Sequence, residues 1–186
     1  DQIKPNWIRK NQEERLSEIP AAGWPCNTLG NHDSWRVWTR YGDGTHDRER
    51  AQLSLALMLT LRGTPFLYNG EEIGMANMAF DDVAILRDTL ALRQYDLAVN
   101  LGGMPPQEAA ALVCRETRDV CRTPVQWANA PNAGFCPAEV TPWLPVNLNY
   151  TAGVNVADQE MDPHSMLAFY KRMLMLRKQS PALVAG

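Results

Sequence analysis

Three polar residues follow a short run that we interpret as a strand, Trp24 to Leu29. They are Asn31, His32 and Asp33, which come directly after Gly30. In parallel α/β folds, side chains at the carboxyl ends of strands converge on the ligand crevice. There an Asp can hold developing positive charge, and a neighbouring His can donate a hydrogen bond to a substrate hydroxyl. The alternative is that Asp33 caps a turn and His32 is an ordinary loop residue.

Two adjacent carboxylates, Glu71 and Glu72, follow a second expected strand, Phe66 to Tyr68. Paired carboxylates suggest general acid–base chemistry. Adjacent residues in an extended segment point to opposite sides, so at most one of the two can face a pocket. We therefore expect structural roles for both.

Arg122 opens the run Arg-Thr-Pro-Val-Gln-Trp. A guanidinium can hold a hydroxyl or a carboxylate with its planar fork of donors. Trp127 and Trp143, further along, could stack on the apolar face of a ring. Taken alone, these residues favour a different reading, in which Arg122 clamps an Asp between loops and the tryptophans lie in the core.

The elements that must position these residues form a βαβ pattern. A polar helix is expected over residues 6–18. Between the two expected strands, residues 45–62 predict a helix that Thr45 or Asp47 caps and Gly63 ends. That helix is apolar on nearly every side, which predicts burial. Two strands joined by a buried helix indicate a parallel sheet.

Residues 75–160 are less regular. The pattern predicts helices over 81–99 and 107–117 and an ordered insertion or long loop over 123–157. A last helix is expected from Pro163, capped by Asp162, to Ser180.

Composition sets limits on the class of protein. The 186 residues are 45% hydrophobic, which is enough for one modest core, and the net charge of −3 argues against binding nucleic acid through a basic face. No stretch approaches the ~20 apolar residues of a membrane helix. The four cysteines lack CxxC spacing, so we expect no zinc site; we expect buried thiols, with pairing and compartment left open. Since the chain begins at Asp1 and ends soon after a helix, we expect both ends to lie within something larger.

Several motifs resemble those of a known family. The run Gly30 to Arg36 resembles the strand-seven signature of the α-amylase superfamily of glycoside hydrolases, and Gly63 to Met75 resembles its strand-eight signature. The run Arg122 to Trp127, followed by Pro131 to Phe135, is similar to the α-glucosidase and oligo-1,6-glucosidase branch, as is Pro142 to Asn147. These signatures occur in the family's order over nearly the whole chain.

The resemblance implies an α/β fold, namely the C-terminal portion of a (β/α)8 TIM barrel from about the sixth helix to the eighth. Residues 1–186 would form a partial catalytic barrel domain with an insertion at 75–160 after the last strand. Family members cleave α-glucosidic bonds with retention, using a nucleophilic and an acidic carboxylate. By resemblance, Asp33 is the third carboxylate, which stabilises the transition state. His32 and Arg122 bind the substrate, an α-linked glucose oligosaccharide, and neither a cofactor nor a metal is implied.

The departures from the family matter for function. The family's nucleophile and acid lie on the fourth and fifth strands, which would precede Asp1, so we expect the isolated chain to be inactive. We then expect the missing N-terminal part of the same barrel to be a partner of this chain. Smaller departures are Trp35 for Pro, Asn69 for Gln or Tyr, and Val125 for Met. The preference for α-1,4 or α-1,6 linkages stays open.

Two other functions remain. The parent protein could be a transglycosylase, such as a trehalose synthase or a sucrose-active relative; the Arg122 motif and the Asn132–Phe135 run weigh against this. It could also be a non-catalytic partner of a membrane transporter. The presence of His32, Asp33 and Arg122 together argues instead for a working sugar site.

Overall fold

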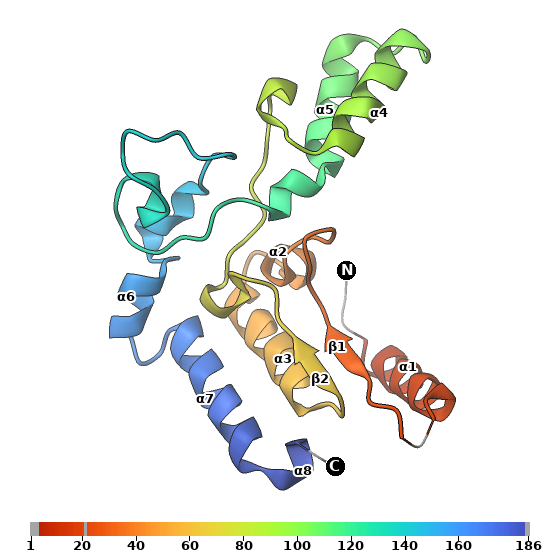
Figure 1. The fold of residues 1–186 in the computed structure, drawn as a ribbon, viewed down its shortest axis with the longest axis vertical. Helices are drawn as coiled ribbons and strands as arrows, with labels where there is room; N and C mark the ends of the chain where they lie inside the picture. The colour runs from red at the N-terminus through yellow and green to blue at the C-terminus, as the bar shows by residue number, and fades with distance from the viewer. Residues whose placement is uncertain (1–3, 21, 185–186) are drawn as a thin grey trace.

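The computed structural model describes residues 4–20 and 22–184. Two short parallel strands, β1 (Cys26–Thr28) and β2 (Thr64–Phe66), lie side by side with Cys26 opposite Thr64 (Figure 1). Helices α2 (Val37–Tyr41) and α3 (Asp47–Thr60) connect them. The predicted parallel βαβ unit is therefore confirmed, and α2 is an additional helix that the sequence pattern did not predict.

The second strand begins and ends two residues earlier than predicted. Thr64 N donates to Pro25 O across the strand pair at 2.9 Å, which starts the ladder before Phe66. Tyr68 O accepts from Glu71 N at 3.0 Å and so belongs to the following turn. This turn, rather than apolar character, ends the strand.

Helix α3 is buried on one side only. Its buried residues Ala51, Leu55 and Leu59 pack with Met166 of α7 (Met166–Gln179). By contrast, 61% of Leu53 is exposed. The expectation of all-round burial was wrong because the leucines of this helix point to several sides and α7 covers only one.

The predicted cap of α3 was also wrong. His46 is the capping residue and makes no side-chain cap bond. Asp47 instead accepts from the backbone N–H groups of Asp43 and Gly44 at 2.7 and 2.8 Å. Asp43 in turn accepts from Thr45 N at 3.0 Å. These carboxylates hold the turn before the helix rather than the helix end itself.

Helix α1 (Pro5–Glu18) matches the predicted polar helix and lies beside β1 in Figure 1. Arg15 of this helix donates from Nη1 to Cys26 O at 2.9 Å and also to the Asn27 side chain. These bonds attach α1 to the strand.

Helices α4 (Thr89–Asn100) and α5 (Pro106–Glu116) form a hairpin that projects away from the strands (Figure 1). The second matches the expected helix over 107–117. The first begins eight residues later than predicted, because Asp88 caps it by accepting from Leu90 N at 3.1 Å. A second core packs beneath the hairpin and includes the buried residues Leu86, Val113, Cys114, Val120 and Leu144.

The segment from 117 to 165 is mostly irregular, as the expected insertion or long loop over 123–157 implied, and it contains three 3-10 turns. It also contains the short helix α6 (Val156–Met161), which was not predicted. Ser165, not Asp162, caps α7, since its Oγ accepts from Ala168 N at 3.1 Å. Asp162 ends α6 and accepts from His164 N at 2.8 Å. The predicted start of the last helix was thus wrong by three residues. A final turn, α8 (Pro181–Val184), follows it.

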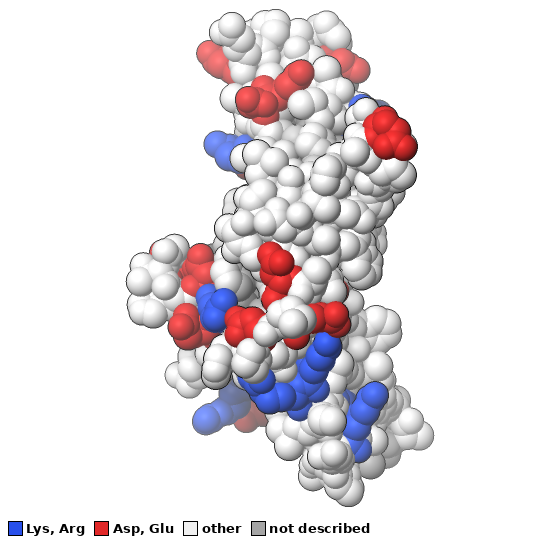
Figure 2. All heavy atoms as spheres, turned by 90° about the vertical axis from the view of Figure 1, so that its left-hand side faces the viewer, with Lys and Arg blue, Asp and Glu red and all other residues white. Residues whose placement is uncertain are grey.

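The structure also bears on the expectations for the cysteines, the surface charge and membrane-spanning helices. Cys114 and Cys121 are buried, but Cys26 is exposed and Cys136 half-buried; all four are unpaired thiols. Acidic and basic side chains intermingle on the lower part of the face in Figure 2. Over residues 4–20 and 22–184, none of the helices has the length and apolar character to cross a membrane.

Candidate active site

Asp33 and Arg122, 89 residues apart in sequence, are in direct contact. Arg122 donates from Nη2 to Asp33 Oδ1 at 2.8 Å and from Nε to His32 O at 2.7 Å. The three residues predicted as a site therefore lie together. A guanidinium that holds both a backbone carbonyl and a side-chain carboxylate fixes the orientation of each.

Arg118 is a fourth member, which the sequence reasoning missed. It donates from Nη1 to the same oxygen, Asp33 Oδ1, at 3.0 Å. Arg118 and Arg122 stand at either end of one 3-10 turn, Arg118–Cys121 and its capping residue. The signal in the sequence was this spacing of two arginines, which brings both to the same side of a single turn.

The second carboxylate oxygen of Asp33 is differently placed. His32 Nε2 lies 3.3 Å from Oδ2, and the Asp33 side chain is 49% exposed. Oδ1 thus takes both arginines, while Oδ2 faces an exposed imidazole. Because solvent reaches this edge, a ligand hydroxyl can also reach it.

Opposing influences act on the ionisation of Asp33. Partial desolvation favours the protonated form. The hydrogen bond from Arg118, the charge of His32 and the hydrogen bond from Arg122 outweigh it and hold the pKa of the Asp33 carboxyl below its usual value. The group is therefore an anion under ordinary conditions and is suited to facing developing positive charge.

A compact turn presents His32 and Asp33. Asn31 Oδ1 accepts from Asp33 N at 2.8 Å, and Thr28 Oγ1 donates to Gly30 O at 2.9 Å. The first of these is the bond by which Asn favours turns. The polar run after β1 thus folds into a turn. The alternative interpretation expected a turn capped by Asp33, but the acceptor is Asn31.

Buried Arg36 ties this turn to the loop after β2. It donates from Nη1 to Asn69 O at 2.8 Å and stacks on the Tyr68 ring at 4.9 Å from its centroid. Its own backbone N–H donates to Asn77 Oδ1 at 2.8 Å. Arg36 therefore sets the spacing between the two polar loops that leave the parallel strands.

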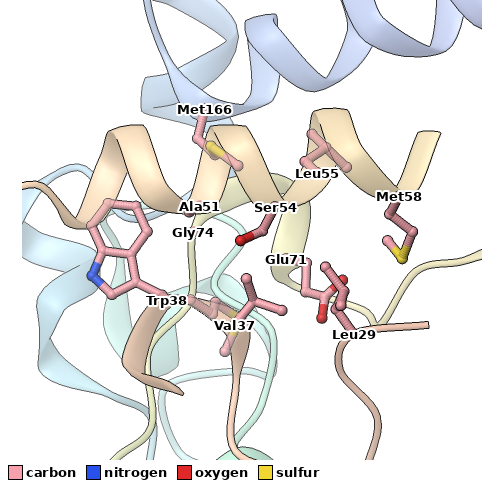
Figure 3. Close-up of a pocket in the computed structure, with 11 residues that line it drawn as sticks. Leu29, Val37, Trp38, Ala51, Ser54, Leu55, Met58, Glu71, Gly74 and Met166 are labelled. Carbon is pink, nitrogen blue, oxygen red and sulfur yellow. The ribbon is translucent and has the colours of Figure 1, made fainter. Parts of the chain in front are cut away.

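Glu71 and Glu72 both accept hydrogen bonds from the backbone of their own turn, which agrees with the expectation of structural roles. Glu71 is buried and accepts from Tyr68 N at 3.2 Å through Oε2, while its Oε1 has no hydrogen-bond partner. Burial raises the pKa of Glu71 to about 7. Glu72 accepts from Gly70 N at 2.8 Å. Figure 3 shows Glu71 beside Leu29 and Ser54 at a small, largely apolar cavity.

The expected alternative for Arg122 is half right. Arg122 does clamp an Asp between two loops, but the tryptophans do not lie in the core. Trp127 is 50% exposed and Trp143 is 64% exposed. Trp143 instead stacks on Phe135, with ring centroids 6.5 Å apart. Within the described residues, no group of three or more His, Cys, Asp or Glu side chains is arranged to hold a metal ion.

Comparison with known proteins identifies the family to which this site is related. Residues 2–186 match the model of the α-amylase catalytic domain. The chain is 38% identical over 180 residues to an oligo-1,6-glucosidase of Parageobacillus thermoglucosidasius, covering 96% of this chain and 32% of that one. The chain thus spans about a third of the length of the curated relatives it matches.

Solved structures agree with this match. A trehalose-6-phosphate hydrolase of Bacillus licheniformis superposes with a TM-score of 0.84 at 34% identity, covering 100% of this chain and 33% of that one. An isomaltulose synthase of Erwinia rhapontici NX5 gives a TM-score of 0.85 at 32% identity with the same coverage. These neighbours are TIM-barrel enzymes of the α-amylase family, which supports a fragment of that fold for this chain. The chain belongs to the α-amylase catalytic-domain family.

Proposed function

We propose that this chain is part of an exo-acting, retaining α-glucosidase that hydrolyses α-glucosidic bonds in short oligosaccharides. The observation that carries the proposal is the convergence of His32, Arg118 and Arg122 on Asp33. A relative named oligo-1,6-glucosidase supports the substrate class.

The finer assignment of the fold belongs to the same proposal. Strand β1 is the seventh strand of the barrel and β2 the eighth, with α3 as the seventh helix and α7 as the eighth. Residues 1–186 are then a partial barrel domain, and residues 75–160 are an insertion after the last strand. The parallel pairing of β1 with β2 supports this order, since neighbouring barrel strands are parallel.

In this mechanism, Asp33 stabilises the oxocarbenium-like transition state. The two arginines neutralise and orient Oδ1, which leaves Oδ2 to meet the sugar. His32 donates a hydrogen bond to a hydroxyl of the glucosyl unit. Arg122 binds the non-reducing end of the substrate while it also holds the Asp33 carboxylate. The nucleophile and the general acid come from strands outside this chain, at a separation of about 5–5.5 Å in retaining enzymes.

The test is a pair of assays with a chromogenic α-glucoside. The complete enzyme should turn the substrate over, and Asp33→Asn should lower its kcat by about 10³-fold, as removal of an electrostatic stabiliser does. Retained activity in Asp33→Asn contradicts the role of Asp33. A non-catalytic, transporter-associated relative predicts a different outcome, namely that the wild type and Asp33→Asn are both inactive.

The second assay measures the activity of the isolated chain. It should be inactive, since it supplies one of the three carboxylates. Turnover well above buffer by residues 1–186 alone would contradict the assignment of nucleophile and acid to other strands.

Transglycosylation is the alternative chemistry. The structural similarity of this chain to an isomaltulose synthase supports it. Both reactions pass through the same glycosyl-enzyme intermediate and differ in whether water or a sugar accepts the glucosyl group. Product analysis with sucrose and with isomaltose distinguishes them: a hydrolase releases free glucose from isomaltose, whereas a transglycosylase yields an isomeric disaccharide.

A further inference from the structure

Asp88 lies behind Arg118 and is almost fully buried, with 3% of the residue exposed. Its carboxylate accepts from both ends of the Arg118 fork: from Nε at 2.9 Å to Oδ2, and from Nη2 to Oδ1. It also accepts from the backbone N–H of Arg118 at 3.1 Å. The third donor of that fork, Nη1, is the one that reaches Asp33.

The position of Asp88 is itself determined by further bonds. Asp119 is buried and accepts from the backbone N–H groups of Arg87 and Asp88 at 2.6 and 2.8 Å through Oδ2. Asp88 Oδ1 accepts from Leu90 N as the cap of α4. A continuous set of bonds therefore runs from the start of α4, through Asp88 and Arg118, to Asp33.

We propose that Asp88 is a positioning residue of the active site, which fixes the guanidinium of Arg118 so that Nη1 holds Asp33 Oδ1 in its working orientation. This proposal rests on the proposed function of Asp33. Asp88 touches no substrate in it; its effect on the reaction passes through Arg118.

The bidentate pairing of Asp88 with Arg118 favours this role over a purely structural cap. A cap needs one side-chain oxygen and no charge, as Asn147 demonstrates at the 3-10 turn Leu148–Ala152. Asp88 instead spends both oxygens on one arginine and makes a bidentate pair, the arrangement that fixes a guanidinium in direction as well as position. Arg118 has its Nη1 directed at Asp33 as a consequence.

The experiment uses the complete enzyme and compares Asp88→Asn with Asp82→Asn. Asn keeps a side-chain oxygen to cap α4 but removes the charge and one acceptor from Arg118. Asp82 is the matched control: it caps the 3-10 turn Val83–Ile85 by accepting from Ala84 N at 2.8 Å, is exposed, and has no bond to Arg118 among the described contacts.

We expect Asp88→Asn to lower kcat by about tenfold with KM within about twofold, because a catalytic group displaced by a fraction of an ångström loses transition-state contacts rather than substrate affinity. Asp82→Asn should keep the wild-type kcat. A wild-type kcat in a folded Asp88→Asn enzyme overturns the proposal.

A double-mutant cycle with Arg118→Gln tests directly whether Asp88 acts through Arg118. If Asp88 acts through Arg118, then adding Asp88→Asn to Arg118→Gln changes kcat no further. Multiplicative effects of the two substitutions overturn the proposal, since they indicate separate routes to the site. Where Asp88→Asn does not fold, Asp88→Ser enters the same cycle, because Ser also caps helices and leaves no amide beside Arg118.

Failure of the proposed function remains distinguishable. A wild-type enzyme that does not hydrolyse α-glucosides contradicts the role of Asp33 before Asp88 is tested. If the wild type is active but the effects of Asp88→Asn and Arg118→Gln on kcat multiply, only the inference about Asp88 is contradicted.

Discussion

Gly30 lies so close to the carboxylate of Glu71 that a Cβ at residue 30 would overlap Oε1. The backbone of Gly30 does not have the positive φ that several other glycines of this chain have, so the requirement for glycine is one of space. The loop that presents His32 and Asp33 therefore rests directly on a buried acid from the loop after β2.

Gly30→Ala should destabilise the protein by about 1–3 kcal/mol, because the added methyl overlaps Glu71 Oε1 and forces this buried carboxylate to move. Denaturant unfolding measures this loss. In a Glu71→Ala background the obstructing carboxylate is gone, so the same substitution should cost less. Equal costs in the two backgrounds would show that the two residues do not compete for space.

Glu71→Gln should change how stability depends on pH. The pKa of Glu71 is raised from 4.5 to about 7 by burial, so the folded state binds its proton more tightly than the unfolded state does. The free energy of unfolding therefore falls as pH rises from about 4.5 to 7 and levels off above that. Gln carries no such proton and removes this fall.

The difference in unfolding free energy between Glu71→Gln and the wild type should thus grow in favour of the variant between pH 4.5 and 7, by up to about 3 kcal/mol. Urea titrations at several pH values provide the measurement. Glu72→Gln is the control, since Glu72 is less buried. A pH-independent difference for Glu71→Gln means that the acid is ionised in the folded state.

Arg36→Ala should destabilise the protein by about 2–4 kcal/mol, because it removes a buried side chain together with its bond to Asn69 O. Arg62→Ala is the matched control. Arg62 also stacks on an aromatic ring, that of Trp24 at 5.4 Å, but it is exposed, and its loss should cost under about 1 kcal/mol. Similar losses at the two positions would show that burial of Arg36 carries no extra weight.

Arg122→Gln should move the acidic limb of the pH–activity profile of the complete enzyme to higher pH. Its hydrogen bond helps to hold the pKa of Asp33 down, so without it Asp33 takes up a proton at a higher pH and activity that needs the anion is lost sooner. A profile of kcat/KM against pH checks the direction. An acidic limb that stays in place would indicate that Asp33 is not the group whose ionisation limits activity there.

The sequence predicted the parts of this molecule that local chemistry decides. The βαβ unit follows from two short strand-like runs with a helical pattern between them, and the polar residues Asn31, His32 and Asp33 were expected directly after the first strand. The turn that these residues form was only the alternative interpretation of the sequence, and its acceptor is Asn31 rather than Asp33. The approach of Arg122 to Asp33 came from resemblance, since nothing in local spacing relates residues 89 positions apart.

Other features depend on contacts between distant segments, which no local pattern contains. The start of α4 was misplaced because the helical spacing continues upstream, whereas Asp119 and Arg118 draw Asp88 into a cap. The start of α7 was misplaced because Asp-Pro resembles a helix opening, yet Asp162 closes α6 instead. Arg118 went unnoticed although its spacing from Arg122 is a local signal, because its partners Asp33 and Asp88 come from two other parts of the chain.

The bidentate pair of Asp88 and Arg118 also closes the base of the α4–α5 hairpin, one residue before α4 begins and two residues after α5 ends. The far end, at Leu101–Gly103, is exposed, and a Cβ added at Gly103 would meet open space. Because the same stem holds Arg118 against Asp33, we expect a short insertion or a grafted tag at the tip to leave Asp33 in place as long as the Asp88–Arg118 pair stays formed. The tip is therefore the part of the hairpin to which a reporter can be attached, and the pair is the part that such a change must leave intact.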